Sequence, residues 1–429
     1  MRVTILGLWH LGSVTAACCS EHFETVGLDF DPKIINDLQQ GKAPIAEPGL
    51  NDLIASGLQT NKLRFTTDIA DACNQTDILW VCYDTPVDEN DVANVDFVLN
   101  GVQLCLPSLP SNAVILISSQ LPVGTAKKIE SWPETKNRSI AVSPENLRLG
   151  QALEVFRHPD RVIIGARNSQ THTKLELLFA PFSKNIIKMK SESAEMVKHA
   201  LNGFLALSVT YINEISRLCE KVGADAKEVE KGLKTDLRIG PRSYLSPGPA
   251  FAGGTLARDV VFLSDLGNAT QTKLELIPSI KQSNDHHRLW PLEQLKILFP
   301  SLNGKNIALL GLTYKPGTDT LRRSSAIELA HALQKENALV QAFDPAVNQL
   351  PEEFLFIRLK TDIRSAIKKT DAIIICTPWS EFKALPWSEL IPLTHQPIII
   401  DAYRFLIDSL QGISKIRYFT VGSCYDFEK

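Results

Sequence analysis

The chain has 429 residues, about three times the ~150 residues typical of one domain, so we expect two or three domains. It has 44% apolar residues, 22% charged residues and a net charge of −3 from 45 basic and 48 acidic side chains. This ordinary globular composition argues against disorder and against a nucleic-acid partner. Eight cysteines are too sparse for a disulfide scaffold, and none forms a zinc-type CxxC pair. We expect reduced thiols in a cytoplasmic compartment, and no metal site.

The apolar start of the chain, residues 1–11, lacks a basic segment and continues into Gly12 and a helical pattern. We therefore expect no signal peptide. Nowhere do about 18 uncharged apolar residues follow one another, and neither end carries a lipidation motif. The sequence predicts a soluble protein without a membrane partner.

The first part of the chain has the pattern of an α/β domain. Residues 2–6 are a β-branched and leucine run that ends at Gly7, residues 12–21 are an Ala- and Cys-rich helical stretch, and residues 25–28 are a second apolar run that ends in Asp29. This order predicts a βαβ unit. Further strands are expected at residues 78–82, 114–117 and 161–165. Residues 1–190 therefore predict a doubly wound, Rossmann-like domain with a parallel sheet.

The middle of the chain is predicted to be helical. Strand signals disappear at residue 191, and residues 194–222 carry a periodicity long enough for about eight helical turns. The Gly- and Pro-rich residues 244–254 interrupt the pattern, because Pro247 and Pro249 lack backbone donors. We interpret these residues as a functional loop within a helical region, residues 191–298.

A second, smaller α/β domain is expected over residues 299–429. The pattern predicts strands at residues 307–310, 339–343, 372–376 and 397–400 and a helix at residues 325–337, and the second strand again ends in an acid, Asp344. The two α/β halves are similar in architecture only, since no repeat of fixed period is found.

The loop after the first strand is a candidate dinucleotide site. In Gly7-Leu-Trp-His-Leu-Gly12 the first and last glycines of GxGxxG are present, but the middle glycine, which lets the backbone approach the pyrophosphate, is Trp9. The loop alone fits a plain strand-to-helix turn equally well. Asp29 favours the cofactor site, because a carboxylate about 20 residues on can hold the ribose hydroxyls and would repel a 2′-phosphate. We therefore expect NAD rather than NADP.

The chain resembles the UDP-glucose/GDP-mannose dehydrogenase family over almost its whole length. The likeness is carried by Pro44-Ile-Ala-Glu-Pro-Gly-Leu50, Asp84-Thr-Pro86, Ser119-Gln-Leu-Pro-Val-Gly-Thr125, Ser143-Pro-Glu-Asn-Leu-Arg148, His158-Pro-Asp-Arg161, residues 198–214, Asp236-Leu-Arg-Ile-Gly240, Gly253-Gly254 with Asp259, and Leu312-Thr-Tyr-Lys-Pro-Gly-Thr-Asp319 with Arg322. The resemblance implies NAD-dependent oxidation of the C6 alcohol of a nucleotide sugar. It also implies an NAD domain, a central helical region that forms a homodimer, and a C-terminal UDP-binding domain.

The resemblance also assigns roles to residues. Lys198 and Asn202, four apart on one helix face, resemble the pair that holds the oxyanion and the catalytic water, with Asp259 and Glu145 as acids. The positions implied for cofactor binding are Gly7, Trp9, Gly12, Asp29, Lys33, Thr85, Gln120 and Arg322. Those implied for substrate binding are Glu145, Arg148, Lys198, Arg238 from the neighbouring subunit, Tyr244, Phe251, Gly253 and Lys315.

Several positions depart from the family pattern. The family's cysteine nucleophile, four residues before the position of Asp259, corresponds to Thr255 here. A threonine hydroxyl ionises far above neutral pH, whereas a thiol has a pKa near ~8.5, so covalent catalysis of a second oxidation is not expected. Other positions also differ: Gln120 replaces a threonine, Leu149 a carboxylate, Ala252 a glycine and Arg258 a lysine.

Three interpretations follow from the sequence. The first is a nucleotide-sugar dehydrogenase that transfers one hydride, or oxidises a hydrated aldehyde without a covalent intermediate; Lys198, Asn202 and Asp259 favour it. The second is a catalytically silent nucleotide-sugar-binding protein with a regulatory role, which Trp9 and Thr255 favour. The third is a hydroxy-acid dehydrogenase of similar layout, against which the second α/β domain argues.

Overall fold

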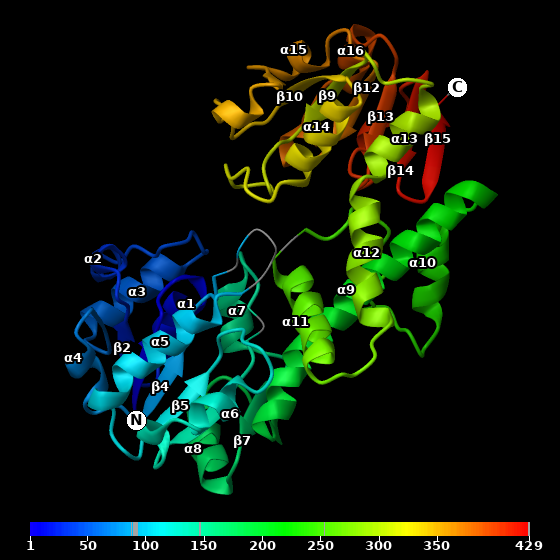
Figure 1. Ribbon diagram of the computed structural model, residues 1–429. Helices are drawn as coiled ribbons and strands as arrows, with labels where there is room; N and C mark the ends of the chain where they lie inside the picture. Colours follow the sequence, from blue (N-terminus) through cyan, green and yellow to red (C-terminus); the bar gives the residue numbers. More distant parts are fainter. Residues whose placement is uncertain (87, 89–92, 146, 253, 428–429) are drawn as a thin grey trace. The chain divides into compact units, whose positions relative to one another are not determined.

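The computed structural model describes residues 1–86, 88, 93–145, 147–252 and 254–427 (Figure 1). They form two compact units, Met1–Leu201 and Asn202–Lys429. Each unit contains one sheet whose strands are mostly parallel, and long helices lie between the sheets along the chain. The predicted α/β class with two Rossmann-like sheets and a helical centre is confirmed.

The sheet of the first unit has eight strands among the described residues, in the order β3-β2-β1-β4-β5-β6-β7-β8. They are β1 (Arg2–Leu6), β2 (Glu24–Leu28), β3 (Leu63–Thr66), β4 (Ile78–Val81), β5 (Val114–Ile117), β6 (Ser139–Val142), β7 (Val162–Ala166) and β8 (Ile186–Met189). All neighbours are parallel except β6 and β7, which are antiparallel. The strand order reverses between β1 and β4, where the carboxyl ends of parallel strands open a crevice for a ligand.

Both faces of this sheet are buried because its strands are apolar on both sides. Ile78 and Trp80 of β4 belong to one core cluster, and Leu79 and Val81 belong to another on the opposite face. The helices of the unit are α1 (His10–Ser20), α2 (Pro32–Gln39), α3 (Leu50–Gln59), α4 (Ile69–Cys73), α5 (Val95–Cys105), α6 (Thr125–Glu130), α7 (Ala152–Arg157) and α8 (Ser169–Phe179).

A continuous helix of 32 residues, α9 (Ser191–Val222), begins in the first unit and ends in the second. It is three residues longer at its start than the pattern predicts. It is followed by α10 (Ala226–Thr235), α11 (Thr255–Ala269), α12 (Leu276–Arg288) and α13 (Trp290–Leu298). The Gly- and Pro-rich loop lies between α10 and α11, as expected. Within the described ranges, no helix is both long and apolar enough to cross a membrane.

The second sheet has seven strands among the described residues, in the order β11-β10-β9-β12-β13-β14-β15. They are β9 (Asn306–Leu310), β10 (Leu339–Phe343), β11 (Arg358–Leu359), β12 (Ala372–Ile375), β13 (Ile398–Asp401), β14 (Ile416–Thr420) and β15 (Ser423–Phe427), and the last pair is antiparallel. The helices with it are α14 (Ser325–Lys335), α15 (Ile363–Ile367) and α16 (Trp387–Leu390). Short 3-10 turns are η1 (Leu106–Ser108), η2 (Pro133–Thr135), η3 (Glu352–Phe354), η4 (Ser380–Ala384), η5 (Ile391–Leu393) and η6 (Asp408–Leu410).

Candidate functional site

The glycine loop closes tightly between β1 and α1. Gly7 has a φ of +88°, which favours glycine, and its N–H donates to the carbonyl oxygen of Leu28 at 2.9 Å. A Cβ on Gly12 would lie 1.7 Å from the Gly7 carbonyl oxygen. The first and last glycines therefore let the start of α1 rest directly on the strand end, as a dinucleotide pyrophosphate requires.

Trp9 does not strain this loop. It is the N-cap residue of α1, and its φ of −75° is available to any residue. Its side chain makes no capping hydrogen bond and is 46% exposed. The negative φ at the middle position therefore does not require a glycine.

Asp29 lies at the end of β2 and is mostly buried. Its Oδ2 accepts the N–H of Leu8 at 2.7 Å, and its Oδ1 accepts the N–H of Asp31 at 3.0 Å. Each oxygen keeps a second lone pair, so the carboxylate can hold the glycine loop and a ribose hydroxyl together. Lys33, in the first turn of α2, donates its N–H to Asp31 at 2.8 Å. These residues fit NAD.

The second half of the chain repeats this local geometry. Gly311 also has a φ of +88°, and Asp344 at the end of β10 accepts the N–H of Leu312 at 2.6 Å. The likeness of the two halves thus extends beyond architecture. Asp344 Oδ2 also accepts the N–H of Thr313 at 3.0 Å and Nε1–H of Trp379 at 3.2 Å, which Asp29 does not match.

Two further positions predicted for cofactor binding lie just after β4 and β5. Thr85 Oγ1 donates to the carbonyl oxygen of Gln120 at 2.8 Å, and the N–H of Leu11 in α1 donates to Asp84 Oδ2 at 3.3 Å. The structure therefore brings the segments of Thr85 and Gln120 beside the glycine loop, although they are far apart in the sequence. Parallel strands end at the same edge of the sheet, which explains the clustering.

Lys198 pairs with Glu145 in the first unit. Its Nζ donates to the Glu145 carbonyl oxygen at 2.7 Å and to Oε1 at 3.2 Å, while Oε2 accepts the N–H of Leu147 at 2.7 Å. Gln120 lines the same small cavity as both side chains. Three residues predicted for the site therefore lie together.

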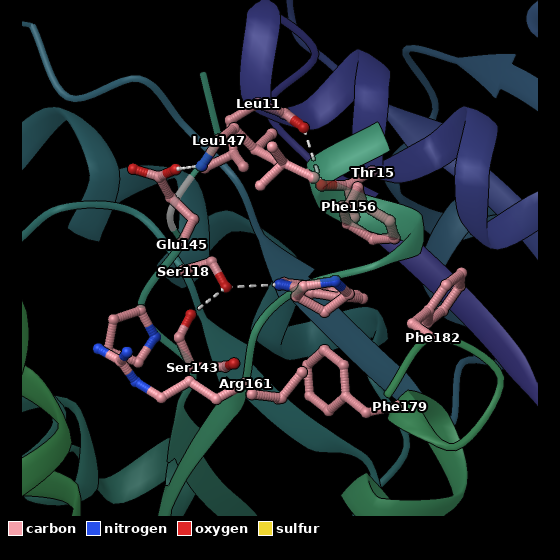
Figure 2. A pocket seen from close by; sticks show the side chains of 15 residues that line it. Leu11, Thr15, Ser118, Ser143, Glu145, Leu147, Phe156, Arg161, Phe179 and Phe182 are labelled. Atoms are coloured by element: carbon pink, nitrogen blue, oxygen red, sulfur yellow. Dashed lines mark hydrogen bonds between the residues drawn. The ribbon is translucent and has the colours of Figure 1, made fainter. Parts of the chain in front are cut away.

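A larger cavity of about 80 Å³ adjoins this pair (Figure 2). Its wall includes Leu11 from α1 and both Glu145 and Leu147. Inside it, Trp80 Nε1–H donates to Ser118 Oγ at 2.8 Å, and Ser118 donates to the carbonyl oxygen of Ser143 at 2.5 Å. An aromatic wall is added by Phe156, Phe179 and Phe182. Sequence reasoning missed these aromatic residues, which look like ordinary core positions.

In the second unit, the amide of Asn202 donates to the Asp259 carboxylate, and both side chains are buried. Thr255 is the first residue of α11, one turn before Asp259, and is exposed. Asn202 and Asp259 are thus brought together as predicted, on α9 and α11. Asp259 keeps Asn202 in a fixed orientation, so the two act as one polar unit.

Three buried side chains that sequence reasoning missed hold the Gly- and Pro-rich loop. Asn284 pairs with the N–H and the carbonyl oxygen of Phe251, both at 2.9 Å. Asn213 accepts the N–H of Gly248 at 3.1 Å. His287 Nε2–H donates to the Gly248 carbonyl oxygen at 2.9 Å. No local pattern marks these residues, because each acts on a backbone group more than 30 residues away.

His287 is held in its neutral form. Burial is the main reason that its pKa is lowered to about 4; the hydrogen bond to Gly248 acts in the opposite direction, and the nearby charge of Arg217 adds to the effect of burial. Its Nδ1 accepts from Arg217 at 3.1 Å. The neighbouring His286 is largely exposed beside Glu293, so the two histidines point to different sides of α12.

The loop meets the carboxyl edge of the second sheet. A cavity of about 50 Å³ is lined by Pro249 and Ala250 of the loop, Ser325 of α14, Cys376 after β12 and Tyr403 after β13. It lies near the reversal of strand order between β9 and β12, where doubly wound sheets bind ligands.

Among the described residues, the remaining positions predicted for substrate and cofactor binding are exposed or half-buried. Arg148, Tyr244 and Arg322 are exposed, Lys315 is half-buried, and Arg238 pairs with Asp236 at 2.7 Å while its side chain is 89% exposed. Gly253 lies outside the described residues.

Comparison with known proteins decides the family. Residues 1–183 match the NAD binding domain of the UDP-glucose/GDP-mannose dehydrogenase family, residues 192–286 its central domain, and residues 308–408 its UDP binding domain. The UDP-glucose 6-dehydrogenase TuaD of Bacillus subtilis (strain 168) is 32% identical over 98% of this chain and 93% of its own length. The chain belongs to the UDP-glucose/GDP-mannose dehydrogenase family. It is an NAD-dependent nucleotide-sugar dehydrogenase.

Other known proteins are similar to this chain over nearly its whole length. The UDP-glucose 6-dehydrogenase of Rickettsia bellii (strain RML369-C) is 33% identical over 99% of this chain and 100% of its own. A solved UDP-glucose dehydrogenase from Pyrobaculum islandicum superposes with a TM-score of 0.85 at 25% identity, covering 98% of this chain and 97% of that one. A UDP-D-ManNAc dehydrogenase from Pyrococcus horikoshii has a TM-score of 0.84 at 24% identity, with 98% and 99% covered, and so shares the fold.

We expect Gly12→Ala to raise the Kd for NADH at least about tenfold, because the added methyl group would collide with the Gly7 carbonyl and push α1 from the loop. Trp9→Gly is the matched control in the same loop. Its half-exposed ring and ordinary φ predict a change within about fivefold. Fluorescence titration with NADH measures the Kd of both variants. An unchanged Kd for Gly12→Ala would contradict the inference that the glycine loop closes tightly against α1.

We expect NAD to bind more tightly than NADP, and Asp29→Asn to narrow the difference, because the amide does not repel a 2′-phosphate and keeps one acceptor for the loop. Asp29→Ala should also narrow the difference between the NAD and NADP affinities. It should also destabilise the fold by about 1–3 kcal/mol, since the N–H of Leu8 loses its acceptor. Calorimetric titration and thermal unfolding measure the two effects. Equal affinity of the unmodified protein for both cofactors would contradict the assignment of Asp29.

Proposed function

We propose that this dehydrogenase oxidises the C6 hydroxyl group of a UDP-hexose to the aldehyde, and carries out the second oxidation slowly or not at all. The observation that carries the proposal is the pairing of Lys198 with Glu145, which keeps a mostly buried ammonium group at the wall of a cavity that Gln120 also lines. The names of the Bacillus and Rickettsia relatives support UDP-glucose as the substrate.

Lys198 and Asn202 supply the electrostatic part of the proposed reaction. When bound, NAD supplies the acceptor for the hydride. Lys198 and Asn202 lie one turn apart on α9, so an ammonium and an amide donor can stabilise the negative charge that develops on the C6 oxygen. Asp259 orients the amide, and Glu145 orients the ammonium.

Thr255 limits the proposed reaction. As the first residue of α11, it would sit where a helix N-terminus favours a thiolate if it were a cysteine. A threonine hydroxyl stays protonated at neutral pH and forms no thiohemiacetal. The aldehyde must then leave, or react as its hydrate.

We also propose three functional regions: residues 1–190 for NAD, residues 191–298 for assembly, and residues 299–429 for the uridine nucleotide. The three family matches, which leave short gaps near residues 184–191 and 287–307, support these boundaries.

A homodimer built on α9 is the proposed assembly. Phe204, Tyr211 and Leu218 are 64%, 47% and 61% exposed and follow one another at intervals of seven residues, which places them on one stripe of the helix. Val222 extends the stripe at 76% exposed. A second copy of the chain would cover this stripe, and the exposed Arg238 could then reach the neighbouring subunit.

With UDP-glucose, we expect close to one NADH per sugar consumed, because no nucleophile retains the aldehyde between two hydride transfers. Thr255→Cys should raise the yield of uronate, and Thr255→Ser serves as the control that keeps a hydroxyl. Absorbance of NADH and chromatography of the products measure the ratio. If the unmodified protein forms two NADH per sugar at a steady rate, the proposal that the second oxidation is slow or absent is refuted. No turnover in any variant would favour the silent binding protein.

The protein should scatter light as a dimer at micromolar concentration, and Leu218→Glu should shift it toward the monomer, because the new charge interrupts the apolar stripe. Arg238→Ala should weaken UDP-glucose binding in the dimer. Lys231→Ala, which removes an exposed cation on α10, should not. A monomeric unmodified protein would contradict the assembly.

A further inference from the structure

Glu47 lies in the segment between α2 and α3, and its side chain is 1% exposed. Its Oε1 accepts the N–H of Ala152 at 2.8 Å. Its Oε2 accepts the N–H of Gly150 at 2.8 Å and the Nε2–H of His10 at 3.1 Å. One buried carboxylate therefore joins its own segment to two others, whose bonded residues are 37 and 103 to 105 positions away from Glu47 in the sequence.

One side of this junction is the start of α7. The N-cap residue of α7, Gln151, makes no side-chain hydrogen bond to the helix. Glu47 satisfies the N–H of Ala152 instead. The position of residues 150–152 thus depends on Glu47. These residues directly follow the segment that carries Glu145, the partner of Lys198.

The other side is the dinucleotide loop. His10 is the first residue of α1 and directly follows Trp9. The loop and the Glu145 segment also share a wall, because Leu11, Glu145 and Leu147 line one cavity (Figure 2). A small shift of the dinucleotide loop or of the Glu145 segment is therefore transmitted to the other segment, through the hydrogen bonds of Glu47 and through the shared cavity wall.

We propose that Glu47 is a positioning residue that couples the dinucleotide loop to the Glu145 segment, so that cofactor and nucleotide sugar strengthen each other's binding. The inference rests on the proposed function, which places NAD at the loop and the nucleotide sugar at the Glu145 segment. Such coupling is reciprocal, and a factor of about 5 to 150 is typical of coupled sites.

The test uses NADH with UDP-glucose, since the reduced cofactor cannot oxidise the sugar and no turnover occurs. The Kd for NADH is measured by fluorescence with and without saturating UDP-glucose. In the unmodified protein we expect UDP-glucose to lower the Kd at least about fivefold. The coupling ratio is the Kd for NADH without UDP-glucose divided by the Kd with it. In Glu47→Gln this ratio should fall to within about twofold of one, because an amide has one acceptor oxygen and cannot accept from His10, Gly150 and Ala152 together.

Two further variants separate coupling from folding. His10→Phe removes the bond to the loop and leaves both bonds to the 150–152 segment, so it should lose the coupling without losing stability. Glu21→Gln is the matched control: Glu21 pairs with Arg157 at 2.8 Å and joins the other ends of α1 and α7. It should keep the full ratio.

The outcomes distinguish the inference from the proposed function. If both ligands bind the unmodified protein and the ratio is near one, or if Glu47→Gln and His10→Phe keep the full ratio, the inference is wrong and the proposed function stands. If the coupling ratio also falls to near one in Glu21→Gln, the effect comes from a general loss of packing between α1 and α7, and the role proposed for Glu47 is wrong. If NADH or UDP-glucose fails to bind at all, both fail.

Discussion

The close approach of Gly12 to the Gly7 carbonyl is the constraint on which the first unit depends. Because no Cβ fits between them, α1 begins directly on the end of β1. That placement brings three residues of the loop within reach of three acids from different segments: Leu8 bonds to Asp29, Leu11 to Asp84 and His10 to Glu47. The loop is thus held by carboxylates from three different segments.

The two functional loops are held by different chemistry. Burial alone would raise the pKa of Glu47, but the N–H groups of Gly150 and Ala152 and the His10 ring outweigh it and lower that pKa, so this carboxylate is charged at neutral pH. Residues 246–251 are held by three neutral groups, the amides of Asn213 and Asn284 and the His287 ring with its pKa of about 4, and by the Glu230 carboxylate, which accepts from Ser246 at 2.6 Å. Charged acceptors bind the backbone N–H groups of the glycine loop more strongly than neutral acceptors would.

The sequence predicts the features that have a local signature. The glycine loop, Asp29 at a strand end and the Lys198–Asn202 spacing on one helix face all follow from patterns within about 25 residues, and the structure contains each of them. The antiparallel pair of β6 and β7 has no such signature, because pairing direction is set by tertiary connections. Glu47, Asn213, Asn284 and His287 were missed for the same reason. Their partners are backbone groups of distant segments, which carry no side-chain pattern.

The two halves show why one motif alone does not identify a dinucleotide site. Asp29 and Asp344 occupy the same position after the second strand, and each accepts the N–H that follows a left-handed glycine. Asp344 Oδ2 is further occupied by the N–H of Thr313 and by the Trp379 indole, so it has no free lone pair on that oxygen for a ribose. Asp29 keeps a free lone pair on each of its two carboxylate oxygens. Within the described part of the chain, Asp344 Oδ1 accepts only the N–H of Ala346, as Asp29 Oδ1 accepts only that of Asp31, so the two acids differ at Oδ2 alone. The same backbone geometry therefore leaves different acceptor capacity in the two halves, and the neighbours of the acid, rather than the acid itself, make the difference.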